Sequence, residues 1–378
     1  MQTATRPRRA KIPAQRLFFP AAAIHAALIL PLSIAVMTST LSWPAGLAGG
    51  HGYEMLFGFA LALVVGYLLG PQPKARLYGV FLLWLAARIS YLADPGGVFA
   101  GLANMLFALA AAWLIAPKLL AAKKWRNRVI SPLVTCLFLL PILYIITTHK
   151  PLFHTATLLH IGIVLLSLLM AFMGGRILSA AAAGEFYRRG DNLEARVQPR
   201  LEAAFIILLI AAAVLIAFRP AAIPAGLCLI AAGLVTATRL ARWRLWRCRQ
   251  RPDLIALGAG YGWLATGMLF MGVTLITGTG FSHAMHVITI GALGTLSISI
   301  AARVHLQSIK AALERQYIFT TATILIALAT LSRLLTIAWP ASALALIGIA
   351  ALAWSLAYLL LLKVLLSRPA NNSATAPG

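Results

Sequence analysis

The sequence predicts an all-α polytopic membrane protein, a bundle of about twelve transmembrane helices with both termini in the cytoplasm. Composition, the spacing of apolar stretches and the placement of basic residues predict it. Of the 378 residues, 61% are hydrophobic and 11% are charged, whereas soluble domains are about half apolar and about a quarter charged. This apolar excess excludes a soluble enzyme, because a soluble core of this size cannot bury so much apolar surface.

Each predicted span is an apolar stretch near the roughly 20 residues that cross a hydrocarbon layer of about 30 Å. Proline, glycine and Lys/Arg clusters separate these stretches. The joint at Arg219-Pro220 is very short, so eleven spans are the alternative count. The predicted spans are 17–40, 52–70, 76–93, 97–117, 129–148, 152–175, 201–218, 221–239, 256–278, 282–302, 316–338 and 342–366.

Basic residues set the orientation of these spans. The chain has 32 Lys and Arg against 8 Asp and Glu, and nearly all the basic residues lie in the N-terminal arm and in every second joint. Cytoplasmic loops carry such an excess of Lys and Arg, so these joints and both termini are predicted to be cytoplasmic. The charge is then explained by anionic lipid headgroups, and a nucleic-acid partner is not expected.

The chain is predicted to comprise a basic cytoplasmic N-terminal arm (1–16), a single transmembrane bundle (17–366) and a disordered cytoplasmic tail (367–378). The longest joints, 176–200 and 239–255, are too short to be domains. The three cysteines are scattered without a C-x-x-C motif, which gives no support to a disulfide scaffold. Any chemistry must therefore lie in the bundle or at its edge.

Histidines gather toward the predicted outer side. His51 opens the second span, His160 lies roughly 10 Å inside the sixth, and His283 and His286 open the tenth. Imidazoles from several helices suit haem or copper, so these four are the candidate metal ligands. The alternatives are an interfacial cap for His51, structural hydrogen bonding for His160 and chance spacing for the pair. His25, toward the cytoplasm, is expected to be structural.

Glu54 follows His51 by three residues and shares its helix face. It is predicted to accept the second N–H of a ligating histidine, which would fix the tautomer of that ring. An ionisable group in lipid usually turns toward the bundle interior, and Arg88 of the third span is the expected partner of Glu54.

Small residues follow the candidate ligands and are predicted to let a helix or a flat cofactor approach the backbone. Gly58 lies one turn below Glu54. The other predicted cofactor contacts are Gly174 and Arg176 at the end of the sixth span and Gly291 and Gly294 in the tenth.

Five segments resemble motifs of the NnrS family, in the order that the family has them. They are His51-Gly-Tyr-Glu-Met-Leu-Phe-Gly-Phe-Ala60, Leu82-Leu-Trp-Leu-Ala-Ala-Arg88, Gly174-Gly-Arg-Ile177, Gly260-Tyr-Gly-Trp263 and His283-Ala-Met-His-Val-Ile-Thr-Ile-Gly-Ala-Leu-Gly294. The resemblance implies about twelve spans in a bacterial cytoplasmic (inner) membrane, an association with haem and copper, and a link to nitric oxide metabolism or protection from nitrosative stress. It implies no particular reaction, so whether the chain is an enzyme stays open.

The chain departs from the family's motifs at two places where the family often has histidine. Tyr53 stands at one and Leu257-Gly-Ala259 at the other, which removes two metal ligands that the resemblance would imply.

The leading hypothesis is an integral membrane metalloprotein of the nitric oxide response, with haem or copper near the outer face and nitric oxide or a nitrosylated metal complex as its ligand. The first alternative is a transporter of a small or metal-bound solute, which twelve spans suit but a scarcity of ionisable residues in mid-membrane opposes. The second is a non-catalytic assembly partner of a respiratory complex.

Overall fold

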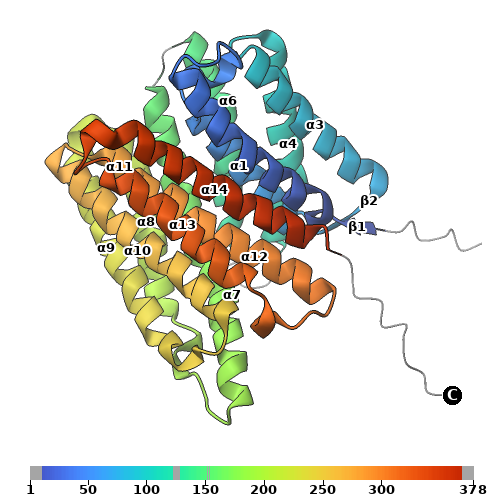
Figure 1. Ribbon diagram of the computed structural model, residues 1–378, viewed down its shortest axis with the longest axis vertical. Coiled ribbons are helices and arrows are strands. Elements are labelled where there is room, and N and C mark those ends of the chain that lie inside the picture. The colour runs from blue at the N-terminus through green and yellow to red at the C-terminus, as the bar shows by residue number, and fades with distance from the viewer. Residues whose placement is uncertain (1–10, 122–127, 151, 153, 368–378) are drawn as a thin grey trace, which may run out of the picture. The chain divides into compact units, whose positions relative to one another are not determined.

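A computed structural model describes residues 11–121, 128–150, 152 and 154–367, and these are almost entirely helical (Figure 1). Residues 1–10 of the predicted arm and residues 368–378 of the predicted tail lie outside this range. Eleven helices of the described part are long and apolar enough to cross a membrane, and a shorter apolar helix covers Glu54–Leu68. The predicted all-α membrane bundle of about twelve helices is confirmed.

The helices follow the predicted order. They are α1 (Gln15–Met37), η2 (Glu54–Ala60) continued by α2 (Leu61–Leu68), α3 (Lys74–Ala93), α4 (Val98–Leu120), α6 (Ile130–His149), α7 (Thr155–Arg188), α8 (Pro199–Ile216), α9 (Ala222–Arg242), α10 (Pro252–Thr277), α11 (Phe281–His286), η6 (Val287–Ala292), α12 (Leu293–Ser308), α13 (Ile318–Leu335) and α14 (Ala343–Leu365).

The chain forms two compact units. Of the described residues, those up to 25 and those within 32–155 form the first, and those within 26–31 and 156–367 form the second. In the first unit α4 packs on α3 and on α6. In the second, α9 lies between α8 and α10, and α13 lies beside α14 (Figure 1). The prediction of a single bundle over 17–366 stays a prediction.

Two helices differ in length from the predicted spans. The helix Glu54–Leu68 is shorter than a full crossing, which takes roughly 20 residues. Helix α7 has 34 residues, whereas the predicted span ends at 175. The helix continues past the predicted end of the span because the alanine-rich turn before Glu185 favours helix and the pair Glu185–Arg189 at i,i+4 spacing supports it.

A small two-stranded sheet belongs to the first unit and was not predicted. Strand β1 (Lys11–Pro13) pairs antiparallel with β2 (Pro71–Pro73). Both strands are three residues long and contain proline, so neither shows the alternating pattern by which a strand is recognised. The sheet fixes the chain just before α1 and just after α2.

Candidate functional site

A buried polar cluster lies inside the first unit around Glu54. The Glu54 side chain is fully buried, and Arg88 is 2% exposed. Arg88 Nη1 donates to Glu54 Oε1 at 2.9 Å, and His25 Nε2 lies 3.0 Å from Glu54 Oε2. The predicted Glu54–Arg88 pair is therefore present. We call His25, Tyr53, Glu54, Arg88 and Asn104 the Glu54 cluster.

Asn104 of α4 completes this cluster. Its Oδ1 accepts from Tyr53 OH at 3.0 Å and also from Arg88 Nη2. Its Nδ2 donates to Ala100 O at 2.9 Å. One carboxylate thus faces one guanidinium, and hydrogen bonds to Glu54 and Asn104 hold the two terminal nitrogens of that guanidinium, which favours a buried ion pair.

Gly58 makes room for the Glu54 cluster. A Cβ at position 58 would lie 2.7 Å from His25 Nε2 and 2.8 Å from Glu54 Oε2. Trp84 Nε1 donates to the Gly58 carbonyl at 3.0 Å. Glu54 and Gly58 both belong to η2, a π-helical segment, and such segments are frequent at functional sites. The space beside Gly58 is filled by the chain's own polar groups.

The histidine against Glu54 is His25, which the sequence assigned a structural role. His51 has its Nδ1 3.4 Å from Ser33 Oγ. The sequence contained a usable indication, because an ionisable residue within an apolar span usually faces a partner in the bundle interior. Which of the two histidines meets Glu54 depends on how α1 packs against η2, and periodicity does not specify that.

The other three candidate ligands belong to the second unit, near the start of α11. The His160 ring lies 4.5 Å from the Phe281 ring, centroid to centroid, in a T-shaped contact. His283 Nε2 lies 3.1 Å from Thr336 Oγ1, and His286 Nδ1 lies 2.5 Å from the Ser282 carbonyl oxygen. The structure therefore brings His160 to the helix that carries His283 and His286.

These residues fit one haem-ligating imidazole better than a copper site with three protein ligands. Within the described part of either unit, no three His, Cys, Asp or Glu side chains are grouped closely enough to hold a metal ion. A haem needs only one or two axial imidazoles. A carbonyl beside Nδ1 fixes the tautomer of His286 with the proton on Nδ1 and leaves Nε2 as the basic nitrogen, the usual arrangement of a ligating histidine.

Most of the glycines predicted to contact a cofactor face side chains of neighbouring helices. A Cβ on Gly291 would lie 2.9 Å from Trp263 Cγ, and one on Gly294 would lie 2.9 Å from Trp354 Cζ3. A Cβ on Gly174 would make an ordinary contact with Leu296 at 3.8 Å. Arg176 holds its guanidinium 5.4 Å from the centre of the Phe172 ring. The cofactor role of these residues stays a prediction.

A second buried cluster lies in the second unit around Arg239, which is 2% exposed. Arg239 Nη1 donates to Tyr261 OH at 2.7 Å and to Ala171 O at 3.1 Å, and Nη2 donates to Glu202 Oε1 at 3.2 Å. A Cβ on Gly175 would lie 3.0 Å from Arg239 Nη1. Two of the recognised motifs, Gly174-Gly-Arg and Gly260-Tyr-Gly-Trp, thus meet at this guanidinium.

This second cluster was not predicted, because Arg239 is one of several arginines in a stretch that is interpreted as a cytoplasmic joint. Helix α9 continues to Arg242, so Arg239 lies within the helix and turns inward. The face of Phe205 lies 4.8 Å from its guanidinium carbon, which adds a cation–π contact.

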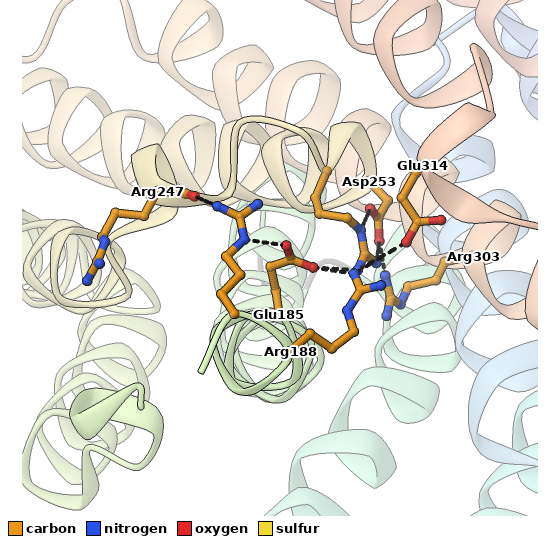
Figure 2. A network of polar contacts seen from close by, with 8 residues as sticks. Glu185, Arg188, Arg247, Asp253, Arg303 and Glu314 are labelled. Atoms are coloured by element: carbon orange, nitrogen blue, oxygen red, sulfur yellow. Dashed lines mark hydrogen bonds and ion pairs between the residues drawn. The ribbon is translucent and has the colours of Figure 1, made fainter. Parts of the chain in front are cut away.

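A network of ion pairs joins the predicted cytoplasmic ends of helices in the second unit (Figure 2). Asp253, which is fully buried, accepts from Arg251 Nε and Nη2 at 2.9 Å each and also from Arg303. Arg251 Nη1 lies 3.0 Å from Glu185 Oε2 and 3.4 Å from Glu314 Oε1. The network therefore ties α7, α10 and α12 together through charges of both signs.

The outer part of the same network is more exposed. Arg189 Nε lies 2.7 Å from Glu185 Oε1, and Arg189 Nη1 donates to the Arg247 carbonyl at 2.6 Å. Arg247 Nη1 in turn lies 2.7 Å from Asp191 Oδ2. These contacts hold the segment between α9 and α10 against the end of α7, which is a structural role.

A family model described as NnrS protein matches residues 14–368, nearly the whole chain. No curated protein and no solved structure matches it.

Proposed function

Because the chain belongs to the NnrS family, we propose that this multi-pass membrane protein is a metalloprotein of the bacterial nitric oxide response. A haem, or copper as the alternative, would be held near the start of α11, at the end of the second unit that the charge pattern assigns to the outer side of the cytoplasmic membrane. Nitric oxide or a nitrosylated metal complex is the proposed ligand.

The observation that carries this proposal is the setting of His286. Its Nδ1 lies 2.5 Å from the Ser282 carbonyl, so the opposite ring nitrogen is the one that can donate to a metal. His283 differs. Thr336 Oγ1 donates to the Arg333 carbonyl at 2.7 Å, so it accepts from His283 and the proton of that ring is on Nε2. His286 is therefore the residue that would hold the haem.

When bound, a haem would supply an iron that coordinates nitric oxide or passes electrons. The contribution of the chain is to fix the imidazole tautomer. His160 and Phe281 provide an aromatic contact at the same place. An outer location suits a small uncharged gas that arrives through the membrane or from the periplasm. A respiratory donor or acceptor of electrons is an additional proposed partner.

The test is an absorption spectrum and a metal analysis of the protein purified in detergent. We expect a Soret band that His286→Ala abolishes. His305→Ala is the matched control, because His305 lies at the opposite end of the same continuous helix and should leave the band unchanged. Protein without haem or copper, or a band that survives His286→Ala undiminished, would refute the proposed ligand.

A transporter of a small or metal-bound solute is the second candidate, and the Glu54 cluster is the observation that favours it. The sequence disfavours a transporter because few ionisable residues lie inside the predicted spans. The structure places His25, Glu54 and Arg88 in contact within the first unit, and intramembrane groups of this kind often line solute or proton pathways. Solute flux into liposomes by metal-free protein would favour this candidate.

A further inference from the structure

Three arginines that lie inside the helices, at positions that are buried or largely buried, are paired with carboxylates. Arg88 donates to Glu54 at 2.9 Å and Arg239 to Glu202 at 3.2 Å. Arg303 is paired with Asp253. The pairing has a physical reason, because a guanidinium removed from water without a counter-charge is costly.

Arg333 differs from these three arginines. It is partly buried and lies two residues before the end of α13. Across the residues that the structure describes, no carboxylate comes within the 4.0 Å ion-pair limit of its guanidinium. Its side-chain partner is neutral: Arg333 Nη1 donates to Thr336 Oγ1 at 2.9 Å. The positive charge is therefore left without a balancing negative charge from the described chain.

The neighbours of Arg333 add donors and no negative charge. Thr336 Oγ1 donates its proton to the Arg333 carbonyl at 2.7 Å, and it lies 3.1 Å from His283 Nε2. A hydroxyl has one proton to give and two lone pairs, so Thr336 accepts from both Arg333 and His283. Thr336 thus fixes the position of the guanidinium, while most of its five N–H groups remain for another acceptor.

We propose that Arg333, positioned by Thr336 beside His283, binds the anionic group of a ligand, a carboxylate or a small oxyanion such as nitrite. A guanidinium is always charged and offers paired N–H donors that match two oxygens on one atom. An oxyanion at this position would neutralise the charge and complete its hydrogen bonds. Helix α13 packs on α11, so the anion would lie next to the helix that carries His286.

This ligand chemistry has two sources. One is a free small anion, and binding of this anion does not depend on the proposed function. The other is a carboxylate of a bound porphyrin, and that source rests on the proposed function. The competing explanation is that Arg333 extends toward the lipid headgroups at the end of α13 and binds no soluble ligand.

The first arm of the test uses sodium formate and sodium nitrite as probes, with sodium chloride for ionic strength. Thermal unfolding of the detergent-purified protein is followed at increasing probe concentration. We expect saturable stabilisation of the wild type by either probe. In Arg333→Gln the apparent dissociation constant should rise at least tenfold, and in Arg333→Lys it should rise less, because the charge stays but the fork of donors is lost. Arg315→Gln changes an exposed arginine on the predicted cytoplasmic side and should behave as wild type.

The second arm compares haem with haem dimethyl ester, whose carboxylates are neutralised, by absorption titration. We expect the wild type to prefer haem at least tenfold and Arg333→Gln to show no preference. A positive first arm in a protein that binds no haem would support the anion site while the proposed function fails. Equal behaviour of wild type and Arg333→Gln in both arms would overturn the anion site. If Arg333→Gln does not fold, unchanged binding in Arg333→Lys would overturn it.

Discussion

Replacing Gly58 by alanine tests whether the Glu54 cluster requires the absence of a side chain at that position. The added Cβ would lie 2.7 Å from His25 Nε2, 2.8 Å from Glu54 Oε2 and 3.0 Å from Arg88 Cδ. Ordinary van der Waals contact begins at 3.4 Å, so the imidazole must withdraw by about 0.7 Å and the carboxylate by nearly as much. Both contacts of the carboxylate, at 3.0 and 2.9 Å, would have to change.

The loss in the free energy of unfolding caused by Gly58→Ala can be bounded. Overpacking a filled interior destabilises by about 1–3 kcal/mol, while replacing glycine by alanine inside a helix gains up to about 1 kcal/mol. Gly79→Ala isolates the second term. Gly79 lies on an exposed face of α3 in the same unit, and no heavy atom lies within 4 Å of its added Cβ. The difference between the two variants should therefore be about 1–3 kcal/mol, with Gly58→Ala the less stable.

The assay is the fraction of monodisperse protein left after heating in detergent. At roughly 2–4 °C per kcal/mol, the midpoint for Gly58→Ala should fall several degrees below that for Gly79→Ala. Equal midpoints would refute the reasoning, since they would mean that the three polar side chains can move apart without cost. A further fall on combining Gly58→Ala with Glu54→Gln, equal to the sum of the single effects, would also contradict it, because groups in one cluster are expected to couple.

Three further outcomes are expected. Gly175→Ala, which would crowd the Arg239 guanidinium, should lower the same heating midpoint, whereas Gly184→Ala on the same helix, with no heavy atom within 4 Å of its Cβ, should not. Asp253→Asn leaves Arg303 without its buried counter-charge and removes one of the three carboxylates that pair with Arg251, so it should cost about 3–5 kcal/mol, seen as a loss of monodisperse protein on expression. Burial raises the pKa of the Cys248 thiol above its ordinary value, so maleimide labelling of Cys248 in the folded protein should be slow at pH 8 and should accelerate as the pH rises; rapid labelling at pH 8, as for an unfolded control, would contradict this.

The helices could be predicted because each depends on a local property of the chain. Hydropathy and the cost of unsatisfied backbone groups in lipid nearly determine where a span can lie, and the order of the spans follows. The ends of α7 could not be predicted in this way. Its extension to Arg188 depends on helix propensity and on ion pairs with residues distant in sequence, including Glu314, which a local window does not contain.

The polar sites could be predicted only in part. The ion pair between Glu54 and Arg88 could be predicted because each is an ionisable residue in an apolar stretch and needs a counter-charge. The contact of His25 with the same carboxylate and the contact of Arg239 with Tyr261 depend on how one helix is rotated against another. That rotation is set by side-chain packing along the whole contact, so spacing within one segment does not reveal it.

The eight acidic residues are therefore the most informative positions in this chain. Basic residues are four times as frequent and occur wherever a loop faces the cytoplasm, so a single arginine says little about structure. A carboxylate contributes nothing to that topology and persists in an apolar chain where a buried cation needs it. Among the described residues, five carboxylates pair with a largely buried arginine: Glu54, Glu185, Glu202, Asp253 and Glu314. Asp191 pairs with the exposed Arg247. By the same reasoning, the partly buried Arg333 should obtain its negative charge from a bound ligand.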